Sequence, residues 1–260
     1  MASNSSFGIA LRQFIALTGT PAQTELSDFA LVHQFVAERN ESAFATLLRR
    51  HGPMVYGVGR RVLRHSEDAE DVFQAAFLLL ARKAASIRKG ESVGSWLHGV
   101  SYHLAIRLAA QRTGRKRHER EAAAMHSRAH GNVSSLPELE KALDEALQQL
   151  PEIYRQALVV CYLEGKSHEE AARILGCPVA TLRSRLARGR QRLHSILTCK
   201  GITLSAAALG CALSTNAADA ARMLPLLRTT LEASLQFAAG KGAEAVVSTS
   251  VASLVEGGLK

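Results

Sequence analysis

Residues 167–199 read SHEEAARILGCPVATLRSRLARGRQRLHSILTC, and this stretch predicts two short helices joined by a tight turn. Ser167 and Glu170 have the spacing of a capping box, in which the hydroxyl and the carboxylate each bond a free backbone N–H at the start of a helix. Gly176 then allows the backbone to turn, and Pro178 starts a second helix with its φ already fixed. This spacing is typical of a helix-turn-helix.

The second of these helices has one apolar side and one basic side. At about 100° per residue, its leucines at 182, 186, 193 and 197 fall within about 60° of one another and form the buried stripe. Arg, Ser and Thr side chains on the other side are donors for guanine edges and phosphates in a major groove. The alternative is a basic face that is merely solvated, but the capping box, the turn residues and the uncompensated charge together favour DNA binding. The candidate DNA-binding residues are Thr181, Arg183, Ser184, Arg185, Arg188 and Arg192.

The charge of the chain supports this interpretation. Its 260 residues include 32 Lys and Arg against 23 Asp and Glu, a formal net charge of +9. Residues 107–128 hold seven basic and two acidic residues, residues 173–200 hold seven basic and no acidic residue, and the remainder is slightly acidic. Two separate basic segments indicate two contacts with one long polyanion, because charge that serves only solubility would be spread out.

Helix-period patterns recur along nearly the whole chain, and no stretch alternates apolar and polar residues over the length of a strand, so we predict an all-α fold. Changes in composition divide the chain into five parts. They are an N-terminal extension (1–25), a helical bundle (26–113), a flexible linker (114–136), a second small helical domain with the helix-turn-helix (137–200) and a helical extension rich in Ala and Leu (201–260). The extension has little bulky apolar content, which predicts that it packs on another part of the chain or is loosely ordered.

Two stretches of the first bundle carry further signals. Residues 66–80, SEDAEDVFQAAFLLL, open a helix with four acidic residues, which oppose the helix dipole favourably. Residues 93–117, VGSWLHGVSYHLAIRLAAQRTGRKR, contain the one tryptophan, Trp96, and run into a basic segment. A tryptophan at such a place either stacks on an unpaired base or belongs to the core.

Together these stretches resemble the sigma factors of bacterial RNA polymerase, in their smallest, extracytoplasmic-function group. Residues 28–51, DFALVHQFVAERNESAFATLLRRH, look like the opening helices of the family, and residues 66–80 and 93–117 look like its polymerase-docking and promoter-melting parts. Residues 150–193, which include the helix-turn-helix, look like its C-terminal domain. The resemblance implies that 26–113 is sigma region 2 and that 137–200 is sigma region 4.

The resemblance also assigns roles to residues. Asp68, Asp71 and Gln74 would contact the clamp coiled coil of core RNA polymerase, and the helix-turn-helix would contact the −35 promoter element. The loop 88–95 would hold a flipped base of the −10 element, and the helix that follows would face the non-template strand, so that melting is a matter of binding alone. The implied −10 residues are Lys89, Ser95, Trp96, Tyr102, His103, Arg107, Arg112, Arg115 and Lys116.

Several further expectations follow. The four cysteines have no CxxC spacing, and no signal peptide or apolar run long enough for a membrane span is seen, so we expect no cofactor, no metal site and a cytoplasmic protein. We expect no catalytic residues, and promoter DNA and core polymerase as partners, with an anti-sigma factor as a further candidate. The extension 201–260 either regulates DNA or polymerase binding or is an inert tail.

Two other functions compete with this reading. The first is a helix-turn-helix regulator that does not recruit polymerase, which would need neither the acidic helix nor the Trp96 region. The second is a metal-dependent nuclease that uses His118, His126 and His130. The second is disfavoured because these histidines fall in the expected linker without a further ligand at metal spacing.

Overall fold

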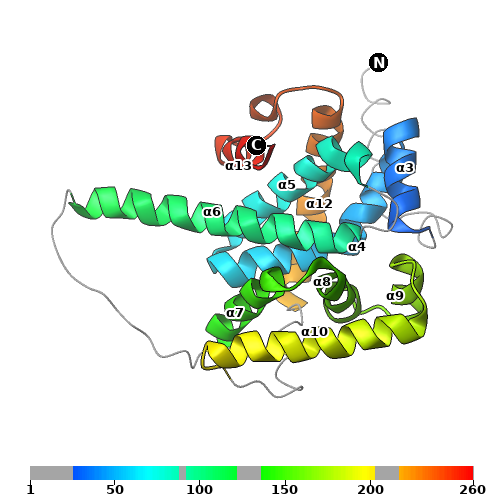
Figure 1. Cartoon of the computed structure of the whole chain (residues 1–260). Helices are drawn as coiled ribbons and strands as arrows, with labels where there is room; N and C mark the ends of the chain where they lie inside the picture. Colours follow the sequence, from blue (N-terminus) through cyan, green and yellow to red (C-terminus); the bar gives the residue numbers. More distant parts are fainter. Residues whose placement is uncertain (1–25, 88–91, 122–135, 203–216, 260) are drawn as a thin grey trace.

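The computed structural model describes residues 26–87, 92–121, 136–202 and 217–259, and every regular element within these ranges is helical (Figure 1). The all-α prediction is therefore confirmed. The expected N-terminal extension, 1–25, lies outside the described residues. The described helices before residue 122 form a first bundle, and those between residues 136 and 202 form a second domain.

The first bundle begins with well-capped helices. Ser27 accepts a hydrogen bond from the amide of Ala30 at 3.2 Å, and Asn40 accepts one from the amide of Ala43 at 3.1 Å. The first two helices of the bundle therefore each begin with a side-chain cap. A 3-10 turn, η1 (Ala84–Ser86), follows the third helix. The four helices are α3 (Asp28–Glu38), α4 (Glu41–Leu63), α5 (Ser66–Lys83) and α6 (Val93–Glu121).

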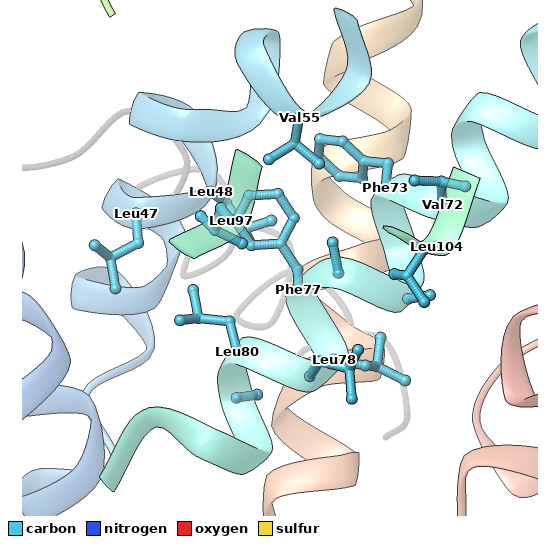
Figure 2. Close-up of a cluster of buried hydrophobic side chains, with 14 of the residues drawn as sticks. Leu47, Leu48, Val55, Val72, Phe73, Phe77, Leu78, Leu80, Leu97 and Leu104 are labelled. Carbon is cyan, nitrogen blue, oxygen red and sulfur yellow. The ribbon is translucent and has the colours of Figure 1, made fainter. Parts of the chain in front are cut away.

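The core of this bundle lies between α4, α5 and α6 (Figure 2). Phe73 and Phe77 of α5 pack against each other with ring centroids 4.9 Å apart, and Phe44 meets Phe77 edge to face at 6.5 Å. Leu97 of α6 closes the cluster and is completely buried. The acidic helix predicted over 66–80 is thus α5, and its apolar residues hold the bundle together.

The second domain buries a separate, smaller core. The leucine stripe of the basic helix packs against Leu143 and Leu147 of the first helix of this domain and against Leu158 of the second. A π-helical turn, η2 (Val159–Leu163), continues directly from the second helix of this domain. Its four α-helices are α7 (Leu136–Gln149), α8 (Glu152–Leu158), α9 (His168–Ile174) and α10 (Val179–Cys199).

Helix α6 is longer than the sequence predicts. Helix α6 continues to Glu121, past the end expected at residue 113, so the first part of the expected linker is helical. That part is rich in Arg, Lys and Glu, which form helices readily although they give no apolar period. The rest of the expected flexible linker, 122–135, lies outside the described residues.

The composition of the C-terminal extension allowed either packing on another part of the chain or loose order. Its described residues, 217–259, pack on the first bundle. It contains α12 (Ala217–Ala238), a 3-10 turn η3 (Ala243–Ala245) and α13 (Thr249–Leu259). Helix α12 packs on α4 and α5, and α13 packs on α5 and α6. In Figure 1, α13 and the second domain lie on opposite sides of α6.

Candidate nucleic-acid interface

The turn between α9 and α10 has the predicted local chemistry. The hydroxyl of Ser167 accepts a hydrogen bond from the amide of Glu170 at 3.2 Å, and the Glu170 carboxylate accepts one from the amide of Ser167 at 2.9 Å. Gly176 has φ +59°, a conformation that L side chains rarely adopt, and Pro178 is the N-cap of α10. The helix-turn-helix therefore has the capping box, the turn and the entry that its sequence predicts.

Helix α10 presents its basic side to solvent. Leu182, Leu186, Leu193 and Leu197 are buried, as predicted. Four of the six candidate DNA-binding side chains are exposed, and two are half-buried at the edges of the stripe. The exposed ones are Arg183, Ser184, Arg188 and Arg192, and the half-buried ones are Thr181 and Arg185.

An open hollow of about 630 Å³ borders this basic side, between α10 and the start of α8. Arg188, Arg192 and Tyr154 line it, and the guanidinium of Arg192 lies 5.0 Å from the centroid of the Tyr154 ring. A cation stacked on an aromatic ring keeps its charge while its orientation is restricted. Arg192 is thus held in place beside a concave, basic surface.

The three predicted polymerase-binding residues all lie on α5, but none is fully exposed. Asp68 is only 3% exposed and forms an ion pair with Arg112 of α6. Asp71 and Gln74 are half-buried. Burial raises the pKa of Asp71 above its usual value, although a hydrogen bond with Ser250 of α13 acts in the opposite direction.

The predicted −10 residues are divided between different environments. Ser95 and Tyr102 are buried, and burial together with Glu145 and Asp144 raises the pKa of Tyr102 to about 12. Trp96 is half-buried, so it is partly a core residue. The exposed members are His103, Arg107 and Arg112. Lys89 and the side chains of Arg115 and Lys116 lie outside the described part of the structure.

Ser95 is buried because the second domain packs on this end of α6. Its hydroxyl donates a hydrogen bond to the carboxylate of Glu152 of α8 at 3.1 Å. Nearby, Asp144 of α7 is completely buried between Arg61 at 2.7 Å and His98 at 3.0 Å. Burial alone would raise the pKa of Asp144, but these two partners lower it below its usual value. The domains therefore meet through a buried, ionised carboxylate.

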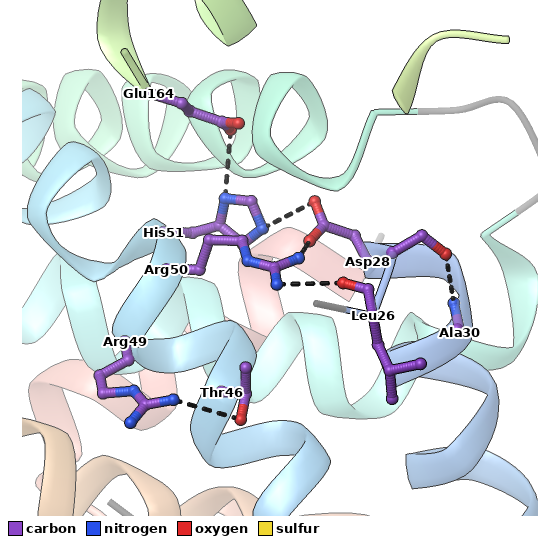
Figure 3. A network of polar contacts seen from close by, with 9 residues as sticks. Leu26, Asp28, Ala30, Thr46, Arg49, Arg50, His51 and Glu164 are labelled. Carbon is purple, nitrogen blue, oxygen red and sulfur yellow. Dashed lines mark hydrogen bonds and ion pairs between the residues drawn. The ribbon is translucent and has the colours of Figure 1, made fainter. Parts of the chain in front are cut away.

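A second charged contact joins the domains at α4 (Figure 3). The imidazole of His51 lies 3.0 Å from Asp28 and 3.1 Å from Glu164, which follows η2 of the second domain. Burial alone would lower the pKa of His51, but the two carboxylates raise it to about 10. Arg50 also pairs with Asp28, and Gly94 leaves the space that the Glu164 side chain occupies.

These contact residues were not predicted from the sequence. Their one signal is a charged residue next to an apolar one, such as Asp144 after Leu143. That signal is weak, because a helix places neighbouring residues on different sides. Only the tertiary structure shows that Asp144, His51 and His98 point into the contact between the domains.

Comparison with known proteins identifies the family. Residues 47–115 match the family described as Sigma-70 region 2, and residues 140–193 match the family described as Sigma-70, region 4. The chain is 33% identical over 179 residues to the ECF RNA polymerase sigma factor SigM of Mycobacterium tuberculosis, covering 69% of this chain and 89% of that protein. The chain belongs to the extracytoplasmic-function (ECF) group of RNA polymerase sigma factors.

This ECF sigma factor has other relatives of similar extent. It is 31% identical over 184 residues to the ECF RNA polymerase sigma-E factor of Escherichia coli K12, covering 66% of this chain and 94% of that protein. A solved structure of the sigma factor RpoE with the anti-sigma factor NepR, from Bartonella quintana, matches with 24% identity over 60% of this chain and 96% of that chain, at a TM-score of 0.29. The two sigma factors from Mycobacterium and Escherichia cover only 69% and 66% of this chain, as expected for a sigma factor that carries an extension.

Membership of the family decides between the three functions considered from the sequence. The protein is a sigma factor that binds core RNA polymerase and promoter DNA and directs transcription initiation, and sigma factors are not enzymes. Among the described residues, no group of three His, Cys, Asp or Glu side chains is placed to hold a metal ion. No helix in that same part of the chain is long and apolar enough to cross a membrane.

Proposed function

We propose that region 4 of this sigma factor contacts the −35 element through α10. The observation that supports this most strongly is the division of α10 into a buried leucine stripe and an exposed basic side that carries Arg183, Ser184 and Arg188. The N-terminal half of such a helix is the part that reaches base edges. Arg185 and Thr181, at the edges of the stripe, would contact the flanking phosphates, together with the stacked Arg192.

Region 2 would contact polymerase and the −10 element. Asp71 and Gln74 of α5 would meet the basic clamp, with Asp68 holding Arg112 beside them. The exposed His103 and Arg107 would lie along the non-template strand, and Trp96 would stack on a base. Arg112 also belongs to the proposed −10 surface, and Ser95, Tyr102, Lys89, Arg115 and Lys116 complete it. The segments expected as extensions and linker, 1–25, 114–136 and 201–260, would flank and join these two functional units.

The two DNA contacts require the domains to separate. Helices α6 and α10 both pack on α8, and packed helices have axes about 8–10 Å apart, so both proposed DNA surfaces belong to one compact body. The −10 and −35 elements are about 25 base pairs apart, or ~85 Å at ~3.4 Å per base pair. The linker 122–135 could bridge up to ~48 Å when fully extended. We therefore propose that the compact arrangement opens when the protein engages a promoter.

A single substitution tests the recognition helix. Arg188→Ala removes one exposed cation from α10, whereas Arg228→Ala removes one from α12, where it pairs with Glu232. We expect Arg188→Ala to weaken promoter binding by about 1–3 kcal/mol and to lower the salt dependence of binding, with Arg228→Ala close to the parent. Equal effects of the two variants, measured by fluorescence anisotropy at several salt concentrations, would reject α10 as the recognition helix.

Two further expectations, on regulation and on cellular location, also belong to the proposal. The Bartonella sigma factor was solved with an anti-sigma factor, and we propose that a protein of that class regulates this chain as well. Because sigma factors work on polymerase at the chromosome, we propose a cytoplasmic site of action. Co-purification from cells under conditions that keep the protein inactive tests the first of these ideas.

A further inference from the structure

Helix α13 lies on residues to which the proposed function gives other partners. The side chain of Ser250, at its start, is hydrogen-bonded to Asp71, a proposed polymerase contact. The carbonyl of Gly258, near its end, accepts a hydrogen bond from Lys83 at 3.2 Å. Gly257 packs so closely on the guanidinium of Arg107, a proposed −10 residue, that a side chain there would displace it. One short helix thus contacts both functional surfaces of region 2.

The charges at the two ends of α13 match its dipole. A helix carries partial positive charge at its N-terminus and partial negative charge at its C-terminus. Asp71 faces the first turn of α13, and Lys83 binds a carbonyl of its last turn. Helix α5 therefore offers an acidic group and a basic group at the positions that favour this orientation of α13.

The apolar contact between α13 and region 2 is close-fitting. Val251, Leu254 and Val255 are at most 1% exposed. A Cβ on Gly258 would lie 2.7 Å from a methyl carbon of Leu79, so the absence of a side chain is what allows the end of α13 to approach α5. Gly258 also borders a cavity of about 170 Å³ that Trp96, Lys83, His103 and Arg107 help to line. The end of α13 thus borders the same cavity as Trp96, on which we propose that a base stacks.

Helix α5 has no free side along residues 75–81. Seven consecutive residues, 75–81, are buried, and a run longer than one helical turn means that every side of the helix is covered. The covering elements are α4, α6, α12 and α13. The proposed polymerase contacts Asp71 and Gln74 lie just before this stretch and are half-buried, so polymerase that docks along α5 beyond them has to displace one of these covers.

The most easily released cover is α13. Helix α12 places Leu227, Leu231 and Phe237 in the main core, beside α4 and α5. Helix α13 is half as long, with 11 residues against 22, and follows a segment that is exposed from Ala239 to Gly242. It also places four buried residues in this core, against six described ones from α12, so its release uncovers less of the core than release of α12 would.

We propose that α13 is an intramolecular cover, which holds region 2 in a state of low affinity for polymerase and for the −10 strand until it is displaced. The proposal rests on the proposed function of region 2. The described structure is then the closed state, and polymerase binds after α13 leaves. Because only the uncovered fraction binds, the apparent dissociation constant is the intrinsic one divided by that fraction. Detaching α13 should therefore tighten binding without changing any residue that touches polymerase.

Two variants detach α13 in different ways. Val255→Asp places a charge at a completely buried position of α13, and truncation after Ser248 removes the helix while keeping α12. Ser253→Asp is the matched control, because it adds the same charge at an exposed position of the same helix. Affinity for purified core RNA polymerase is measured for each full-length or truncated protein, together with circular dichroism to show that region 2 remains folded.

We expect Val255→Asp and the truncation to bind core polymerase at least ~10-fold more tightly than the parent, with Ser253→Asp unchanged. Hydrogen exchange of the parent chain should show α13 losing protection in the polymerase complex while α12 keeps it. If neither detached variant gains affinity, or if α13 stays protected in the complex, the proposal is wrong. If Val255→Asp is unfolded, the truncation alone decides.

A further variant separates this proposal from the proposed function of region 2. Asp71→Lys in the truncated chain removes a proposed polymerase contact when no α13 is present. A loss of affinity there supports the contact, whatever the outcome for α13. If Asp71→Lys has no effect in the truncated chain, the assignment of Asp71 to polymerase fails, while a gain of affinity on truncation would still stand as evidence for the cover.

Discussion

Region 2 is covered from two sides by two kinds of contact. Region 4 contacts it through buried charges, which include Asp144 with Arg61 and His98 and Glu164 with His51. The C-terminal helices contact it through apolar side chains, which include Leu227, Leu231 and Val255. Region 2 thus holds region 4 by ion pairs and the C-terminal extension by hydrophobic burial.

The difference determines how each contact responds to separation. Charges that part are resolvated by water, which offsets much of the attraction that they lose. Apolar side chains that part are exposed to water at a cost of about 25 cal/mol per Å². The contact with region 4 is therefore suited to reversible opening, whereas α12 remains part of the folded core.

The largest effect is expected when Asp144 is removed from the charged contact and its partners Arg61 and His98 remain. Asp144→Ala leaves Arg61 buried without its counter-ion and His98 without its hydrogen-bond partner Asp144, which costs about 3–5 kcal/mol in the closed arrangement. Opening returns both groups to water, so we expect the compact state to be lost. Small-angle X-ray scattering should show a larger radius of gyration.

Glu145→Ala is the matched control for that substitution. Glu145 is the next residue on α7, and its pair with Lys200 is partly exposed, with side-chain exposures of 44% and 31%. Such pairs contribute about 0–1 kcal/mol. If both variants stay compact, the buried charges do not hold the domains together.

Weakening the apolar contact of α12 should have an effect of comparable size, but on the free energy of unfolding and not on the opening of the domains. Leu231 of α12 is 2% exposed, and Leu231→Ala should lower the free energy of unfolding by about 2–5 kcal/mol. Leu224 of the same helix is 66% exposed, so Leu224→Ala should change it little. Urea denaturation compares the two, and equal stabilities would show that α12 is not part of the core.

Local signals in the sequence predicted the helix-turn-helix well. Ser167, Glu170, Gly176 and Pro178 act on the backbone within a few residues, so the spacing alone indicates the caps and the turn. The end of α6 was missed because the basic run after residue 113 gives no apolar period, although its residues favour a helix.

The contacts between parts of the chain could not be predicted in this way. The periodicity of α13 indicates an apolar face, but it does not show which helix that face meets. In the same way, nothing near Asp144 in the sequence indicates Arg61, which is far away along the chain. The proposed polymerase and −10 residues were placed by resemblance alone, so their partial burial under α13 and region 4 could emerge only from the structure.

The pH dependence of opening gives a smaller effect. Asp28 and Glu164 raise the pKa of His51 to about 10, Arg50 pairs with Asp28, and Cys161 lies near Glu164. Asp28 belongs to the same domain as His51, so only the part of this rise that comes from Glu164 stabilises the closed state; that contribution is present at low pH and is lost as pH rises through about 10. We expect energy transfer between dyes on α3 and α10 to fall between pH 7 and 10.

His51→Gln should flatten that pH dependence, because an amide keeps hydrogen-bonding ability but does not titrate. A pH dependence that survives in His51→Gln would assign the effect to other groups.

The smallest effect is expected at Ser95, where the charged contact meets the proposed −10 surface. Ser95→Ala removes a hydrogen bond to Glu152, but the carboxylate keeps Arg155 and Gln156 as donors, so we expect a loss of only about 0.5–1.5 kcal/mol in the closed state. Ser101→Ala is the control, because its hydroxyl donates to Leu97 within α6 and not across the domains. Scattering should show a modest shift toward open molecules for Ser95→Ala alone. If promoter melting falls while opening rises, Ser95 serves both states, and the charged contact competes directly with the DNA for the same hydroxyl.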